Sequence, residues 1–99
     1  MKKEISVIFR KFNNGNIIAL FPYEIETVEG NIMSYEHNGQ HGIANYDHVV
    51  YKTKLATEDE YSDLLNELKE IYAHYKFKLL KKMNRKIYSN ELLRLKFKS

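Results

Sequence analysis

Several residue types are missing or scarce in this 99-residue chain, and each absence excludes a class of protein. There is no cysteine, so disulfide scaffolds and thiolate zinc sites are excluded. With one proline and four glycines, the chain is neither collagen-like nor a low-complexity linker. No apolar run approaches the roughly 20 residues of a spanning helix, and none follows Lys2 and Lys3 as in a secretory signal. We therefore expect a cytoplasmic protein with no membrane partner.

What is present is typical of a single globular domain over residues 1–99. Hydrophobic residues make up 43% and charged residues 29% of the chain, as in ordinary soluble domains. The charge is uneven, because residues 1–75 carry 7 Lys/Arg and 12 Asp/Glu, whereas residues 76–99 carry 9 Lys/Arg and only Glu91. A basic C-terminal segment favours a polyanionic partner, although lysines also simply coat solvent faces.

The first half of the chain predicts strands. Runs of β-branched and aromatic residues are separated by turn signals. The clearest of these signals is Asn13–Asn16, which favours a hairpin. The strand after this turn is apolar at every position, so we expect both of its faces to be covered, and we expect Pro22 to end it. The predicted strands span residues 5–12, 17–21, 32–37 and 49–53.

The second half predicts one helix over residues 58–73. Thr57 and Glu60 match a capping box, and apolar residues then recur at three and four positions as one stripe. After the helix, residues 75–79 alternate and favour a strand over a continuation of the helix. Residues 93–98 also alternate strictly and predict a second edge strand. The expected fold is α+β, a small mainly antiparallel sheet with one amphipathic helix packed on one face.

The motifs of residues 7–72 resemble a family of small uncharacterised proteins of phages and mobile elements. The resemblance rests on separated motifs in a fixed order: Val7 to Phe12, Gly15, Ile18 to Pro22, Ser34–Tyr35, His37, Gly39 to His41, Ala44, Tyr46 and Ala56 to Tyr61. It implies a phage or mobile-element origin and the cytoplasm of a host cell. It implies no activity, since none is established for the family.

Residues 35–48 concentrate polar and aromatic side chains, including three of the four histidines, around a glycine-rich turn. Loops held by a rigid sheet often carry function. The same side chains can instead serve structure, by hydrogen bonding to one another and fixing the loop. The candidate binding residues are Tyr35, His37, Gln40, His41, Tyr46, Asp47 and His48.

The same segment also contains side chains that suit metal binding or catalysis. His37 and His41, with Asp47 or His48, are chemically suited to a metal ion, but they follow no recognised ligand spacing. No nucleophile and base are arranged as in known hydrolases. We therefore predict no metal, no cofactor and no enzymatic activity. A His-based metal-dependent hydrolase is kept as the second alternative.

The basic segment carries the first alternative, a nucleic-acid-binding protein. Lysines interleaved with aromatic residues are typical of phosphate contact combined with base stacking. In a strand, the last three cations of the tail would share one side, and we expect weak non-specific binding to nucleic acid. The candidate residues are Lys76, Lys78, Arg94, Lys96 and Lys98.

The leading prediction is an accessory protein that acts by macromolecular binding. Small size, the missing catalytic pattern and eight tyrosines, which are effective interface anchors, favour a protein partner. An inhibitor or modulator of a host or defence protein is the most specific form of this prediction. A homodimer is left open.

Overall fold

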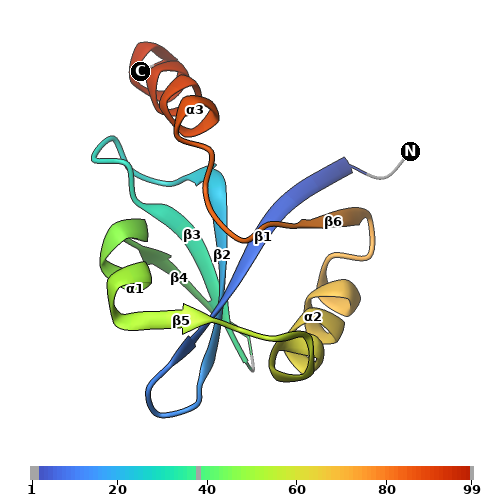
Figure 1. Cartoon of the computed structure of the whole chain (residues 1–99). Helices are drawn as coiled ribbons and strands as arrows, with labels where there is room; N and C mark the ends of the chain where they lie inside the picture. Colours follow the sequence, from blue (N-terminus) through green and yellow to red (C-terminus); the bar gives the residue numbers. More distant parts are fainter. Residues whose placement is uncertain (1–2, 38, 99) are drawn as a thin grey trace.

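The computed structural model describes residues 3–37 and 39–98 and has an α+β fold built on one six-stranded sheet (Figure 1). This confirms the predicted fold class, and the structure adds two helices that the sequence did not predict. In chain order the elements are β1 (Lys3–Phe12), β2 (Ile17–Ile25), β3 (Ile32–Glu36), β4 (Gln40–Ala44), α1 (Tyr46–Lys52), β5 (Thr53–Leu55), α2 (Glu58–Ile71), β6 (Tyr75–Leu79) and α3 (Arg85–Lys98).

The sheet has the strand order β4-β3-β2-β1-β5, with β6 paired to β1 as well. The long strand β1 carries both neighbours on the same side: its first half pairs with β6 in parallel, and its last three residues pair with β5 in antiparallel orientation. The remaining pairs are antiparallel. β4 therefore forms one edge of the sheet, and β5 and β6 share the other.

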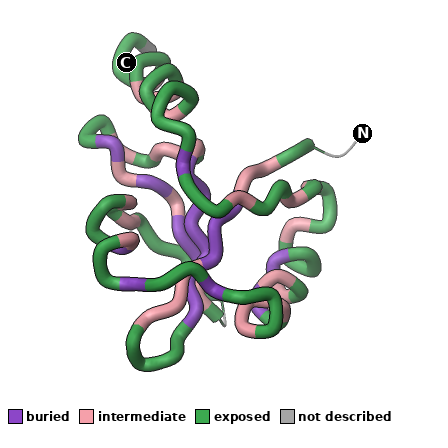
Figure 2. The backbone as a smooth tube through the Cα atoms, viewed as in Figure 1, coloured by how far each residue is buried: buried purple, intermediate pink, exposed green. Residues whose placement is uncertain are grey.

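Both faces of the sheet are apolar, because successive side chains of a strand point to opposite faces. Val7 and Phe9 of β1 belong to the core under α2, whereas Ile8 belongs to the core under α1 and α3. In Figure 2 the buried residues, drawn in purple, accordingly lie along the central strands of the sheet. The expectation that β2 is covered on both faces is confirmed, since residues 17–21 are all buried.

Helix α2 packs on one face, and its range confirms the predicted helix to within two residues. Leu64 and Leu68 are fully buried, and Tyr61 stacks on Phe9 of β1 with the ring centroids 4.6 Å apart. The predicted capping box of Thr57 and Glu60 is present. It satisfies backbone N–H groups that a helix start otherwise leaves without partners.

The prediction that Pro22 ends its strand is wrong. β2 continues to Ile25, and the register with β3 shifts between Phe21 and Ile25. A proline cannot donate to a regular ladder, but an irregularity of this kind tolerates it. Pro22 is buried there, so the irregularity keeps an apolar side chain inside the sheet.

Two further predicted strands are helices instead. The segment predicted as a strand over 49–53 contains the end of α1, which begins after Asn45 because the Asn45 side chain accepts a hydrogen bond from the His48 N–H. The tail predicted as a strand over 93–98 lies in α3, where Asn84 accepts from the N–H groups of Lys86 and Ile87. Leu, Arg and Lys are strong helix formers, so a capped start outweighs the alternating pattern. The strand predicted over 75–79 is confirmed as β6.

Candidate functional site

The candidate binding residues do not form one site, because the structure places them on opposite faces of the sheet. Tyr35, His37 and His41 contact side chains of α2 and of the turn after it. Tyr46 and Asp47 contact the start of α3. We call the first group the hairpin cluster, consisting of Tyr35, His37, His41, Glu67 and Tyr72. We call the second group the α3 anchor, consisting of Tyr46, Asp47, Arg85, Tyr88 and Gly30.

The hairpin cluster centres on the Tyr35 hydroxyl, which belongs to a fully buried residue of β3. This hydroxyl donates to the Glu67 carboxylate and accepts from the Gly39 N–H at 2.9 Å. His37 Nδ1 lies 3.2 Å from the other carboxylate oxygen of Glu67. Burial, and then the Glu67 carboxylate, raise the pKa of Tyr35 above its usual 10.0. The cluster therefore ties the β3–β4 hairpin to α2.

His41 extends the hairpin cluster toward the surface. Its Nε2 lies 2.5 Å from the Tyr72 hydroxyl, and its ring packs edge-on against Tyr35 at 4.7 Å between centroids. Tyr72 in turn packs edge-on against Tyr75 at 5.7 Å. Gln40 does not contribute in the same way, because it is exposed and pairs through its backbone with Glu36. These contacts support the structural interpretation of the hairpin, a hydrogen-bonded loop.

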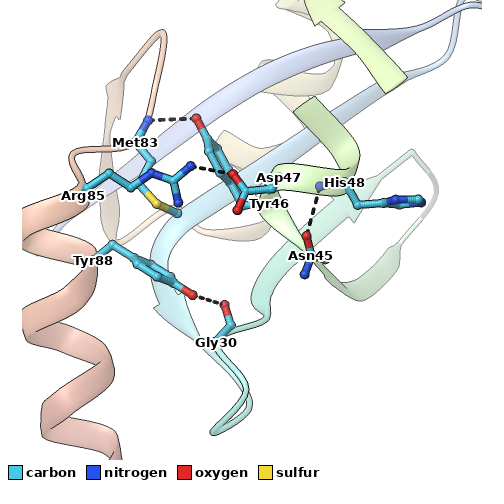
Figure 3. A network of polar contacts seen from close by, with 8 residues as sticks. All are labelled: Gly30, Asn45, Tyr46, Asp47, His48, Met83, Arg85 and Tyr88. Atoms are coloured by element: carbon cyan, nitrogen blue, oxygen red, sulfur yellow. Dashed lines mark hydrogen bonds and ion pairs between the residues drawn. The ribbon is translucent and has the colours of Figure 1, made fainter. Parts of the chain in front are cut away.

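The α3 anchor joins α1 to the start of α3 (Figure 3). The Tyr46 hydroxyl accepts from the Met83 N–H at 3.0 Å, and the Arg85 guanidinium bonds to Asp47 at 2.5 Å and lies over the Tyr46 ring. The bond to Asp47 raises the pKa of Arg85 above its usual value. A second tyrosine hydroxyl, that of Tyr23, accepts from the Asn84 N–H at 2.9 Å.

Tyr88 completes the anchor from the first turns of α3. Its hydroxyl donates to the Gly30 carbonyl oxygen at 2.6 Å. Gly30 is buried at φ +94°, a conformation that favours glycine. The first half of α3 is thus held at several points by α1, β2 and the turn before β3.

The three candidate histidines do not converge. His37 and His41 belong to the hairpin cluster, whereas His48 lies on α1, and its ring points away from Tyr46 and Arg85 in Figure 3. Among residues 3–37 and 39–98, no group of three or more His, Asp or Glu side chains is placed to hold a metal ion. The hydrolase alternative requires that convergence, so the arrangement gives it no geometric support.

The candidate nucleic-acid residues are also dispersed. Lys76 and Lys78 are exposed on β6, and Arg94 pairs with Glu91 at 3.2 Å on α3. The expectation that Arg94 and Lys96 share one side is wrong, because positions two apart in a helix lie about 200° apart around its axis. The side chain of Lys98 lies outside the described part of the chain.

Three large apolar residues in the described part of α3 are exposed, Ile87 near its start and the pair Leu93 and Phe97 in its second half, and the pair was not singled out from the sequence. Leu93 is 50% exposed and Phe97 is 84% exposed. Residues four apart share a face both in a helix and in a strand, so their spacing alone did not show that this pair is exposed. Glu67 and Arg85 were likewise missed, because a carboxylate or guanidinium on a helix gives no sequence sign of its partner.

Comparisons with protein-family models, with curated proteins and with solved structures find no match to this chain. The described helices include none of the length and apolar character that crossing a membrane requires. The observations that bear on function are therefore the two clusters and the exposed half of α3.

Proposed function

We propose that this chain is an accessory protein that acts by binding another protein, with the second half of α3 as the binding element. The observation that carries the proposal is the pair Leu93 and Phe97, exposed one turn apart on a helix whose first half is anchored. Figure 1 shows α3 standing out from the sheet beyond the ends of its strands. The resemblance to phage and mobile-element proteins supports a host or defence protein as the partner, which the chain would inhibit or modulate.

Anchoring the start of α3 prepares the helix for binding. The hydrogen bonds of Tyr46 and Tyr88 and the contacts of Arg85 fix the helix axis relative to the sheet. A binding element that is ordered before it meets its partner loses less conformational entropy on association. The exposed half of α3 can therefore present its side chains in one orientation.

The exposed side chains match a known mode of recognition. Residues four apart lie on the same helix face, so Leu93 and Phe97 form one apolar surface. Helices that dock into grooves use apolar anchors at this spacing. Single exposed apolar residues are common on protein surfaces, but an aliphatic–aromatic pair on a protruding helix supports a docking surface more strongly.

The charged side chains of α3 indicate what kind of partner surface it would fit. Lys86 lies 7 and 11 positions before Leu93 and Phe97, which places it on the same face of α3. Arg94 and Lys96 lie between the two residues in the sequence and are exposed on either side of them around the helix, with Arg94 also paired with Glu91. The complementary surface is an apolar groove with an acidic rim.

A nucleic acid is the second candidate partner. An aromatic ring as exposed as Phe97, next to Lys96, is also suited to stacking on an unpaired base beside phosphate contacts. This candidate requires binding that weakens steeply with salt. A hydrophobic groove would hold α3 with much less salt dependence, so the two candidates are separable.

The test is co-purification from a bacterial host expressing the tagged chain, the Leu93→Ser/Phe97→Ser double variant or Tyr51→Ser. Tyr51 is the matched control, since it is 89% exposed but lies on α1. We expect one host protein to co-purify stoichiometrically with the wild type and the control, and to be lost at least tenfold from the double variant. The captured protein is then purified, and its affinity for the three chains is measured.

Three outcomes would contradict the proposal. They are equal capture by the double variant, equal loss from Tyr51→Ser, and no stoichiometric host protein with the wild type. Nuclease treatment of the lysate separates the two candidates. Capture that disappears with nuclease and at moderate salt supports the nucleic-acid candidate instead.

A further inference from the structure

We infer that two copies of this chain associate through β4, by antiparallel pairing of the two β4 strands into one continuous sheet. β4 is an open edge: it pairs with β3 on one side, and Gln40, His41, Gly42 and Ile43 are all exposed. Ile43 is 60% exposed although it is an apolar, β-branched strand residue. This surface is separate from α3 and does not depend on the proposed function.

The composition of β4 favours a second copy as the occupant. Proteins protect open edges with charged residues or proline, and the opposite edge has Lys54 on β5 and Lys76 and Lys78 on β6. β4 has the sequence QHGIA, with no acidic residue, lysine, arginine or proline. Like charges facing each other across strands are destabilising, so a strand without them is compatible with its own copy.

The hairpin geometry determines which backbone groups face the open edge. The β3–β4 ladder closes at the pair Glu36 and Gln40, which we take to be a hydrogen-bonded pair. Hydrogen-bonded pairs alternate along an antiparallel ladder, so Gly42 directs its backbone groups to Ser34. The backbone groups of His41 and Ile43 therefore point toward the open edge.

A twofold axis at Gly42 satisfies this arrangement. It places His41 of each copy opposite Ile43 of the other, so the His41 carbonyl oxygen of one copy can accept from the Ile43 N–H of the other. The His41 N–H donates to the Gly39 carbonyl oxygen at 3.0 Å within its own chain, and it would turn to the Ile43 carbonyl oxygen of the second copy on pairing. His41 and Ile43 lie two positions apart in β4, so their side chains share one face of the sheet. This is the face that α2 covers, because His41 pairs with Tyr35 and Tyr35 belongs to the core under α2. Each Ile43 would then cover the exposed His41 of the second copy, whose ring already packs against Tyr35.

Glycine at the centre suits the same register. At position 42 the two strands would face each other without side chains, and within its own sheet a Cβ there would lie 3.2 Å from the Ser34 hydroxyl oxygen. The paired segment is only five residues long. Such a small interface is at the weak end of protein association, so we expect a dimer that dissociates in the micromolar range, on the order of 10 μM.

The first test is sedimentation equilibrium of the wild type, Ile43→Lys and Tyr51→Lys over a wide concentration range. We expect a concentration-dependent dimer for the wild type and for Tyr51→Lys, the control on α1, and a monomer for Ile43→Lys. A wild type that stays monomeric at every concentration overturns the inference. So does an Ile43→Lys chain that dimerises as the wild type does.

The second test does not depend on the folding of Ile43→Lys. The chain has no cysteine, so Gly42→Cys combined with Ser34→Ala, which makes room for the new Cβ, introduces one thiol at the proposed axis. Residues facing each other in a non-hydrogen-bonded pair have Cα atoms about 4.5 Å apart, within disulfide range. We expect rapid disulfide-linked dimers on mild oxidation and none for Leu79→Cys at the opposite edge. Equal linking of the two variants overturns the inference.

Discussion

Tyr88 of α3 occupies the space that a side chain at position 30 would need. A Cβ built on Gly30 would lie 2.1 Å from the Tyr88 hydroxyl oxygen, and this hydroxyl donates to the Gly30 carbonyl oxygen at 2.6 Å. The turn before β3 and the helix α3, 58 residues apart in sequence, are therefore fitted to each other. This fit is one of the contacts that hold the first half of α3 against the rest of the fold.

Gly30→Ala is expected to weaken the packing of α3 against the turn before β3 and so to destabilise the fold. Alanine at φ +94° strains the backbone by about 1–2 kcal/mol, and its Cβ also displaces Tyr88. Gly15→Ala is the control, because Gly15 has φ +92° with nothing within 4 Å of an added Cβ. We expect Gly30→Ala to lower the free energy of unfolding by at least about 1 kcal/mol more, as measured by urea denaturation. Equal losses would contradict the fit between Tyr88 and Gly30.

Tyr35→Phe is expected to destabilise the hairpin cluster. The variant leaves the Gly39 N–H without its acceptor and removes a donor to Glu67, and such losses cost about 1–3 kcal/mol. His37→Ala is the comparison, because His37 is 45% exposed and its contact with Glu67 should contribute under about 1 kcal/mol. Thermal and urea unfolding measure both. A larger loss for His37→Ala would assign the structural role to the histidine.

The lowered pKa of Glu60 predicts that the free energy of unfolding depends on pH. The hydrogen bond from Lys11, and then the Thr57 N–H, lower the pKa of Glu60 from 4.5 to about 2. The folded state therefore favours the carboxylate, and its contribution is present above about pH 4.5 and is lost as the pH falls toward about 2.

Glu60→Gln tests this dependence by urea denaturation between pH 7 and pH 2. We expect the variant to be less stable than the wild type at pH 7 and the difference to shrink as the pH falls. Glu58→Gln, which keeps the contact between Lys11 and Glu60, serves as the control. A difference that stays constant over this range would show that Glu60 does not couple protonation to folding.

Binding to nucleic acid is expected to be weak. The cations of α3 are distributed around the helix and Arg94 is paired with Glu91, so few phosphates can be contacted at once. Fluorescence anisotropy with single-stranded and duplex oligonucleotides should give dissociation constants of roughly micromolar or weaker at physiological salt. Arg94→Glu/Lys96→Glu is compared with Lys69→Glu on α2. Nanomolar binding that collapses only in the double variant would favour the nucleic-acid candidate.

Removal of metal ions is expected to leave stability unchanged. His37 and His41 are engaged by Glu67 and Tyr72, and His48 lies on the other face of the sheet. The melting temperature should therefore be the same with and without a chelator. A fall of many degrees that zinc or manganese restores would demonstrate a structural site, because metal binding adds directly to folding free energy.

Local patterns determined much of this fold from the sequence. The β1–β2 hairpin follows from Asn13–Asn16, and α2 follows from its capping box and apolar stripe, because turn chemistry and side-chain period act within a few residues. The strand after α2 was also predictable from the alternation of residues 75–79. These elements need little information about distant partners.

Tertiary structure decided what these patterns could not. The alternation of residues 93–98 would suit a strand, but the segment continues the helix α3, whose start is capped by Asn84 and held by the α3 anchor. The candidate residues 35–48 were separated because Tyr35 and its neighbours face α2, whereas the chain after β4 enters α1, which packs on the opposite face of the sheet. A sequence pattern specifies the period of a segment, whereas its partners, its face of the sheet and its exposure depend on contacts between residues far apart in the chain.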